Sequence, residues 1–458
     1  MTGARTIIEG CAIATVDAAG SEHRDGHVVI EGDRIVAVGA GAAPHAGGEP
    51  VTRIDGRGCL ATPGLVNCHH HLYQSATRGL AQQSTLFEWL VELYPVWARI
   101  DEEVEWAAAR AGLAALARSG CSTSTDHHYV FPAHAGDLLA VEVEAAASIG
   151  LRFHPCRGSM DLGQSGGGLP PDAVVEDRDL ILAASEAAID RFHDPRPGAM
   201  VRVALAPCSP FSVTGELMRD AAELARRRGV HLHTHLAETL DEERFCRQRF
   251  GVRPVEYLES LGWLGGDVWL AHCVHLSGDE VRRFGATGTG VAHCPSSNAR
   301  LGAGIAPVAA LVGAGAPVGL GVDGAASNEA GELAPELRQA LLFARLAGGP
   351  GAMTAREALA LGTIHGARCL GRDDELGSLE PGKLADLALW RLDGLDHAGI
   401  EDPVAALVLG APRPVELLLV GGRAIVSGGE LHTVGEEGLA HDLERASRRL
   451  AGTVEATA

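Results

Sequence analysis

Eight apolar segments alternate with helix-like segments between residues 65 and 324, and this alternation restricts the fold more than any other feature. Strands that alternate regularly with helices form a parallel sheet, and eight such units close into a barrel. The sequence therefore predicts an α/β fold, a (β/α)8 TIM barrel. The predicted strands are 65–71, 121–128, 151–154, 202–208, 230–238, 268–273, 290–294 and 318–324, and the helices between them are 101–120, 134–150, 179–193, 214–229, 242–263, 277–284 and 305–315.

Short apolar strands flank the predicted barrel on both sides. They are separated by Gly and Asp turns, as in the hairpins of a small β domain. We expect a small β-sandwich built from both termini, with residues 1–61 as its N-terminal part, 62–372 as the barrel, and 373–458 as its C-terminal part with a terminal helix. The short strands are 6–8, 12–16, 28–30, 35–38, 385–390, 414–420 and 423–426, and two further helices, 333–346 and 354–370, precede the last three.

Composition excludes several classes of function. A formal net charge of −21 without a basic cluster argues against nucleic acid, which requires concentrated Lys and Arg. No apolar run approaches the roughly 20 residues of a membrane span, and the N-terminus lacks the pattern of a signal peptide. The ten cysteines include no CxxC pair and indicate reduced thiols. We expect a cytoplasmic homo-oligomer whose partner is a small molecule.

Lys383 is the only lysine of the chain, and it lies in a predicted turn near the C-terminus. Schiff-base enzymes and lysine-anchored cofactors need a lysine in the site. These mechanisms are therefore excluded unless Lys383 reaches the pocket.

Polar residues gather where four of the predicted barrel strands end. The carboxyl ends of barrel strands surround one mouth, where barrel enzymes place their sites. Imidazole and carboxylate are ligands of Zn²⁺ and similar cations, so three His and one Asp can surround a single cation, which leaves Glu238 and His272 for acid-base chemistry. The residues at these ends are His69, His71, His235, Glu238, His272 and Asp323.

Several motifs resemble the amidohydrolase superfamily, in its nucleobase-deaminase branch. They are PGLVNCHHH at 63–71, HLAE at 235–238, AHC at 271–273, GVDGAASN at 321–328 and GSLEPGKLADLAL at 377–389. Two-metal members of this superfamily carry a lysine on the fourth strand, and segment 202–208 has none, so the resemblance indicates the one-metal type.

This resemblance implies a role for each residue. One divalent metal per chain, with zinc favoured and iron as the alternative, would be bound by His69, His71, His235 and Asp323. Glu238 would be the proton shuttle, and His272 would orient the attacking water. The physical chemistry agrees, because a bound divalent cation lowers the pKa of water to about 7, and a nearby carboxylate can move protons to a ring nitrogen and a leaving amine.

Within this branch, four segments look most like bacterial 8-oxoguanine deaminases: HHHLYQ at 69–74, TDHHYVFP at 125–132, APCSPFSVT at 206–214 and HLAETLDEERFC at 235–246. Adenosine-type relatives commonly have His where this chain has Cys208. Gln74 can both donate and accept hydrogen bonds, which suits the lactam edge of an oxopurine. The predicted substrate contacts are Gln74, Cys208, His128 and Ser327.

The expected reaction is hydrolytic deamination of 8-oxoguanine to urate and ammonia. The alternatives are another aminated heterocycle, such as isoxanthopterin, a guanine-like base or a hydroxy- or chloro-s-triazine, and a non-catalytic scaffold of the same fold. A non-heme iron oxygenase is disfavoured because a third His leaves fewer open positions on the metal. The aromatic segment 87–97 is interpreted as helix core or as a pocket wall or lid. Five further histidines are interpreted as structural or supporting groups: His127, His231, His233, His275 and His293.

Overall fold

Eight parallel strands close into a barrel in the computed structural model, which describes residues 5–44 and 51–455. Small side chains such as Ala204, Ala206 and Ala292 surround the buried Trp269, so side chains fill this part of the core. The predicted (β/α)8 barrel is therefore confirmed. Its strands are β6 (Leu65–Asn67), β7 (Cys121–His128), β8 (Arg152–Ser159), β9 (Ala204–Pro207), β10 (His231–Leu236), β11 (Val268–His272), β12 (Gly290–His293) and β13 (Val318–Leu320).

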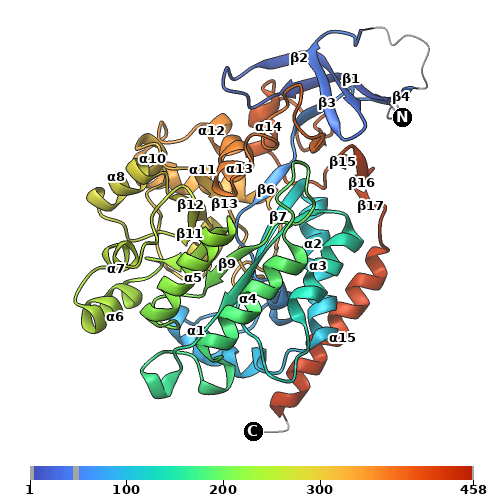
Figure 1. The fold of residues 1–458 in the computed structure, drawn as a ribbon. Helices are drawn as coiled ribbons and strands as arrows, with labels where there is room; N and C mark the ends of the chain where they lie inside the picture. The colour runs from blue at the N-terminus through green and yellow to red at the C-terminus, as the bar shows by residue number, and fades with distance from the viewer. Residues whose placement is uncertain (1–4, 45–50, 456–458) are drawn as a thin grey trace.

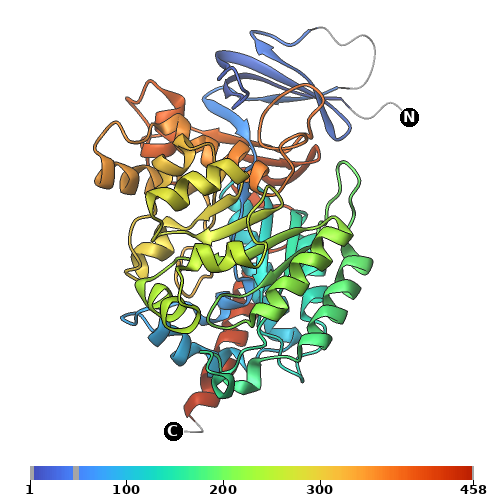
Figure 2. The same cartoon turned by 60° about the vertical axis from the view of Figure 1, so that its left-hand side comes forward.

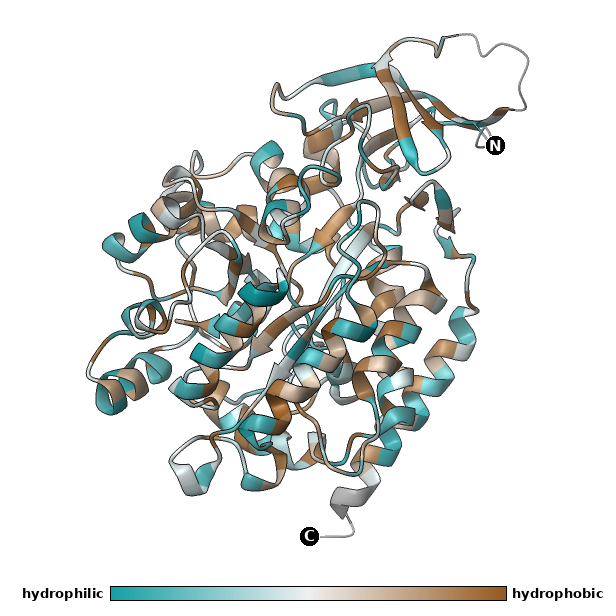
Figure 3. Cartoon of the chain, in the orientation of Figure 1, coloured by the Kyte–Doolittle hydropathy of each residue, from teal (hydrophilic) through white to brown (hydrophobic). Residues whose placement is uncertain are grey.

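Helices surround the barrel, and hydrophilic and hydrophobic residues alternate along them (Figure 3). Local signals set their ends: the Thr214 side chain accepts a hydrogen bond from the Leu217 amide at the start of α5, and Gly229 closes it with φ +67°. The helices are α1 (Leu86–Trp97), α2 (Glu102–Arg118), α3 (Leu138–Ile149), α4 (Arg178–Phe192), α5 (Gly215–Arg228), α6 (Leu240–Phe250), α7 (Pro254–Ser260), α8 (Gly278–Thr287), α9 (Pro295–Arg300), α10 (Val308–Gly313), α11 (Ala334–Gly348), α12 (Ala355–Ala360), α13 (Gly366–Cys369), α14 (Pro403–Leu409) and α15 (Glu436–Glu455).

The segment 242–263, predicted as one helix, is two helices. Gly251 ends α6 in the left-handed region at φ +78°, and Pro254 occupies the first turn of α7. Proline fits a first helical turn but disrupts a helix interior, so the chain breaks the helix here. The prediction of a single helix was wrong for this reason.

The small domain is a nine-stranded sheet that both termini build, as predicted (Figure 2). β5 pairs antiparallel with β14, which joins the N-terminal strands to the C-terminal ones. The predicted strands 6–8 and 12–16 are one strand, β1, whose register shifts near Gly10. The domain boundaries themselves stay a prediction. The strands are β1 (Arg5–Ala14), β2 (Glu22–Glu31), β3 (Arg34–Ala40), β4 (Val51–Asp55), β5 (Cys59–Pro63), β14 (Leu387–Arg391), β15 (Leu417–Val420), β16 (Arg423–Ser427) and β17 (Glu430–Leu431).

The small sheet and α1 lie at opposite ends of the barrel (Figure 1). The end with α1 is the carboxyl end of the barrel strands, where η1 (Leu72–Thr77) follows β6 directly. The terminal helix α15 runs along the barrel and packs against α2 and η1. Within the described residues, no helix has both the length and the apolar composition of a membrane span.

Candidate active site

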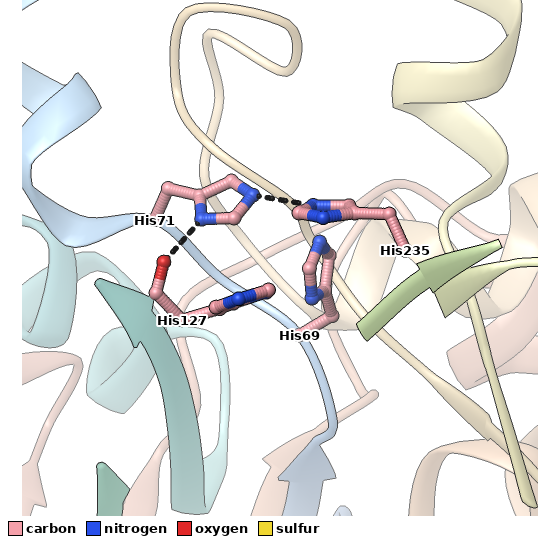
Figure 4. A group of neighbouring side chains, drawn as sticks. All are labelled: His69, His71, His127 and His235. Carbon is pink, nitrogen blue, oxygen red and sulfur yellow. Dashed lines mark hydrogen bonds between the residues drawn. The ribbon is translucent and has the colours of Figure 1, made fainter. Parts of the chain in front are cut away.

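Three histidine side chains converge at the carboxyl end of the barrel (Figure 4). His69 and His71 follow β6, and His235 lies near the end of β10. All three side chains are buried, and the ring of His69 lies within 4.9 Å of the rings of the other two. Residues that the sequence places 164 positions apart thus form one cluster.

The hydrogen bonds of His71 and His235 determine which ring nitrogens carry protons. His71 Nδ1 donates to the carbonyl oxygen of His127 at 2.7 Å, and His235 Nδ1 donates to that of Cys208 at 2.7 Å. A neutral imidazole has one N–H, so both Nε2 atoms carry lone pairs. These two atoms lie 3.1 Å apart and face each other. Burial lowers the pKa of His71 to about 4 and lowers that of His235 well below its usual value, which keeps both rings neutral.

A second histidine, His233, determines in the same way which ring nitrogen of His69 carries the proton. His233 Nδ1 donates to the carbonyl oxygen of Trp269 at 2.8 Å, so His233 Nε2 is an acceptor. His69 Nδ1 lies 2.8 Å from this acceptor and donates to it. The Nε2 atom of His69 is therefore a buried lone pair without a hydrogen-bond donor. From the sequence alone, His233 is predicted only as a structural or supporting group.

Asp323 completes a set of four donor atoms. Its Oδ1 lies 3.3 Å from His71 Nε2 and 3.4 Å from His69 Nε2. Ligands bound tetrahedrally at the usual Zn–N and Zn–O distances lie about 3.3–3.4 Å apart. Burial alone would raise the pKa of Asp323, but the neighbouring histidines, His69 first, hold it well below its usual value. The donor set, three neutral imidazoles and one carboxylate, fits a divalent metal ion.

The second oxygen of Asp323 is bound by serine hydroxyls. Ser297 Oγ donates to Oδ2 at 2.6 Å, and Ser327 Oγ lies 3.4 Å from the same atom. The two hydroxyls are also hydrogen-bonded to each other at 2.8 Å. These contacts orient the carboxylate so that Oδ1 faces the histidines. Ser297 was not among the residues predicted from the sequence, so this support was missed.

Glu238 and His272 face each other beside the donor set. Glu238 Oε2 lies 3.7 Å from His272 Nε2, and His272 Nδ1 donates to the side-chain oxygen of Asn298 at 2.9 Å. Burial raises the pKa of Glu238 to about 7, although His272 opposes the shift. Burial lowers the pKa of His272, but the negative charges of Glu238 and Asp323 have the larger combined effect, so this pKa is raised above its usual value. A carboxyl that titrates near neutral pH suits proton transfer.

A pocket opens above these groups, and apolar side chains form its wall. Gln74 lines it, and neither the oxygen nor the nitrogen of the Gln74 amide has a hydrogen-bond partner among the described residues. A side chain at Gly324 would collide with this amide, so the glycine makes room for it. Cys208 and Ser327 line the same pocket, and their role as substrate contacts stays a prediction. Three of the wall residues lie in the aromatic segment 87–97, which supports its interpretation as a pocket wall; the wall consists of Leu86, Trp89, Leu90, Tyr94, Phe211 and Leu301.

The predicted substrate contact His128 does not reach the pocket. Neighbouring side chains on a strand point to opposite faces, and on β7 the ring of His127 stacks on His235 while His128 faces α3. Both ring nitrogens of His128 have protein partners, the Glu142 carboxylate and the Val130 carbonyl oxygen. Lys383 does not reach the pocket either, because its amino group donates to backbone carbonyl oxygens of Asp373 and Leu376.

Strand ends at the site have unusual backbone geometry. Ala237, His272 and Asp323 have φ values of +51°, +69° and +62°, in the left-handed region that non-glycine residues rarely adopt. Such strain persists only where the surrounding structure holds it, and it concentrates at functional sites. All three residues lie at the ends of strands that carry candidate catalytic groups.

This chain resembles several known proteins in sequence. The Amidohydrolase family matches residues 60–425. The 8-oxoguanine deaminase of Pseudomonas aeruginosa is 51% identical over 82% of this chain and 85% of its own length. An isoxanthopterin deaminase from an unknown prokaryotic organism is 39% identical over 87% of each chain.

A solved structure extends the comparison to the fold. The crystal structure of atrazine chlorohydrolase TrzN from Arthrobacter aurescens TC1, complexed with zinc, superposes with a TM-score of 0.92 at 35% identity and covers 96% of this chain and 100% of that one. These relatives act on small nitrogen heterocycles. The chain is therefore a hydrolase of such heterocycles, and it belongs to the Amidohydrolase family.

Proposed function

We propose that this protein catalyses the hydrolytic deamination of 8-oxoguanine, which with water gives urate and ammonia. The observation that carries the proposal is the Gln74 amide, buried in the pocket with free donor and acceptor atoms. An oxopurine lactam presents one donor and one acceptor and satisfies both. The 51% identity to an 8-oxoguanine deaminase supports the same substrate.

One divalent metal, which we propose is zinc, would be held by His69, His71, His235 and Asp323. It would lower the pKa of a water molecule to about 7 and so supply a nucleophile at neutral pH. Asp323 accepts a proton from the attacking water. Its Oδ1 faces the histidines that would hold the metal, and this places the carboxylate within reach of that water. Ser297 and Ser327 keep that carboxylate oriented through its other oxygen.

Glu238 and His272 perform the remaining steps. As the water oxygen bonds to C2 of the base, Glu238 protonates the adjacent ring nitrogen. The proton that Asp323 accepted then passes through Glu238 to the amino group. As the C2–N bond breaks to release ammonia, the remaining hydroxyl proton passes to Glu238, which forms the C2 carbonyl and restores both carboxyl groups to their starting states. His272 orients the water, because its Nε2 lies near both Glu238 and Asp323 while Asn298 holds its other nitrogen.

The pocket wall favours a flat heterocycle. Trp89, Tyr94 and Phe211 present aromatic surface, and Cys208 adds a small, weakly polar group. Ser327 contributes chiefly through Asp323, to which its hydroxyl is bonded. Isoxanthopterin remains a second candidate substrate, because a deaminase of that pterin is 39% identical to this chain.

Ammonia release across a panel of bases tests the proposal. The panel contains 8-oxoguanine, guanine, isoxanthopterin and a hydroxy-s-triazine. We expect the highest kcat/KM with 8-oxoguanine, and a weaker reaction with guanine, because a buried polar group rejects a base that lacks its matching carbonyl. Strong turnover of isoxanthopterin or the triazine with none of 8-oxoguanine would overturn it. The oligomeric state and the compartment stay predictions.

A further inference from the structure

A second cluster of metal-ligating side chains lies behind the catalytic histidines. It joins three elements: Glu105 from α2, Asp126 and His128 from β7, and Glu142 from α3. All four side chains are fully buried. The donor atoms of Glu105, His128 and Glu142 all lie within 4.8 Å of one another.

In its neutral form, His128 directs a lone pair at the carboxylates. Its Nε2 lies 2.8 Å from the Val130 carbonyl oxygen and must donate to it, so in the neutral ring Nδ1 carries the lone pair. Nδ1 lies 2.9 Å from Glu142 Oε1 and 3.7 Å from Glu105 Oε2. Histidines that bind metals almost always donate their other N–H to a carbonyl or carboxylate oxygen. His128 has this arrangement as His71 and His235 do, but with the two ring nitrogens exchanged.

Four carboxylate oxygens around His128 have no hydrogen-bond donor in the described part of the chain. Both oxygens of Glu105, Oδ2 of Asp126 and Oε2 of Glu142 are buried with only other carboxyl groups or His128 beside them. Within the described residues, none of these carboxylates forms an ion pair with Arg or Lys. Buried charges are costly unless they are paired or bind a metal. Burial raises the pKa of all three carboxyls, so without a cation they would have to take up protons.

We propose that Glu105, His128 and Glu142, with Asp126 beside them, bind a second divalent cation that is distinct from the catalytic metal. Ligands 2.0–2.6 Å from one ion lie about 2.8–4.2 Å apart when they are neighbours, and the distances of 2.9 and 3.7 Å fall in this range. Carboxylate oxygens prefer hard cations and imidazole accepts transition metals, so the donor set suits Mn²⁺.

The second site is connected to the catalytic one through β7. The backbone carbonyl of His127, between Asp126 and His128, accepts the hydrogen bond from His71 Nδ1. Asp126 Oδ1 accepts from the Leu72 amide at 2.6 Å, directly after His71. A cation at this cluster would hold the end of β7, and with it the two contacts that orient His71.

Metal content tests the proposal without reference to substrate. The protein is loaded with Mn²⁺, freed of loosely bound ions by gel filtration and analysed by mass spectrometry of the metals. We expect about two divalent ions per wild-type chain. Glu142→Gln and Glu105→Gln should each lose the ion at the second cluster. His235→Ala should lose the ion at the catalytic histidines. The matched control Glu144→Gln, at an exposed position on the same helix, keeps both.

Unchanged metal content in a folded Glu142→Gln variant, or a single ion in the wild type, would overturn the proposal and identify the cluster as carboxyls that share protons. If the variants do not fold, crystals of the wild-type protein grown with Mn²⁺ decide. An anomalous peak between Glu105, His128 and Glu142 supports the site. A peak at the catalytic histidines alone contradicts it, and that result leaves the proposed deamination intact.

Discussion

The Nε2 atoms of His71 and His235 lie 3.1 Å apart, and neither carries a proton, because each ring donates from Nδ1 to a backbone carbonyl. Two lone pairs at this distance repel each other unless a positive charge lies between them. The backbone hydrogen bonds hold the rings in this arrangement before any ion binds. The fold thus prepares the site for a cation at the cost of an unfavourable contact in its absence.

Replacing His235 by alanine should remove the catalytic metal together with the activity. The substitution deletes one of three imidazole donors, so only His69, His71 and Asp323 remain to bind the cation. We expect the metal content to fall by about one ion per chain and ammonia release to fall to background. The exposed His441 on α15 provides the control, because His441→Ala should change neither quantity. Full metal content in His235→Ala would contradict the proposed ligand set.

Asp323→Asn should separate metal binding from turnover. The amide keeps the shape of the carboxylate and can accept from Ser297, but it carries no negative charge and cannot take the proton of the attacking water. We expect part of the metal to remain while kcat falls by at least about a hundredfold, the usual lower range for general acid-base groups. Metal analysis and steady-state kinetics on the same preparation check this. A variant with near-normal kcat would show that another group accepts the proton.

Gln74→Ala should weaken the recognition of 8-oxoguanine. The lost amide leaves the polar edge of the base without partners, which costs about 1–3 kcal/mol, or roughly 5- to 150-fold in kcat/KM. The exposed Gln82 gives a matched control, since its side-chain amide donates a hydrogen bond to the nearby Gly79 carbonyl oxygen and lies outside the pocket. Equal losses with 8-oxoguanine and with guanine would place the contact at the edge that the two bases share.

Much of this site could be predicted from sequence because its residues follow strands. His69, His235 and Asp323 are far apart in the chain, but the carboxyl ends of barrel strands meet at one mouth. The alternation rule for strands also explains an error: His127 and His128 are adjacent, so only one of them can face the barrel interior. Applied to β7, the rule would have removed His128 from the substrate contacts.

Other contacts have no local signal in the sequence. Ser297 reaches Asp323 across 26 residues, and Asn298 reaches His272 across the same separation, so both depend on how neighbouring strands are staggered. His233 shares a strand face with His235, but its bond to His69 crosses the barrel. The packing of α15 against α2 depends on long-range contacts in the same way. Such pairings become visible only in three dimensions.

Stability should depend on pH through Glu242. Its carboxylate accepts from the amides of Ala237 and Glu238, yet burial raises its pKa from 4.5 to about 7. The folded state therefore favours the protonated form of Glu242. The contribution of Glu242 to the free energy of unfolding is complete below pH 4.5 and is lost as the pH rises to 7. The loss is on the order of 3 kcal/mol.

Urea denaturation of the wild type and of Glu242→Gln between pH 4.5 and 7.5 measures this contribution. The amide does not titrate, so the free energy of unfolding of the wild type should decrease relative to the variant as the pH rises. The exposed Glu223→Gln serves as the control and should follow the wild type. Parallel curves for all three proteins would mean that folding does not raise the pKa of Glu242.

Glu238→Gln is the sharpest test of the mechanism. The amide keeps the length of the side chain and its position near His272, but it cannot release or take up a proton. Glu238 is not among the four donor atoms, so the metal content and the KM should remain close to those of the wild type. General acid-base groups contribute typically about 10²–10⁴-fold, so kcat should fall by at least about two orders of magnitude. A loss in kcat alone identifies a group that acts mainly in the transition state. If the variant loses its metal, Glu238 is a ligand; if it keeps more than about a tenth of the wild-type kcat, another residue moves the proton.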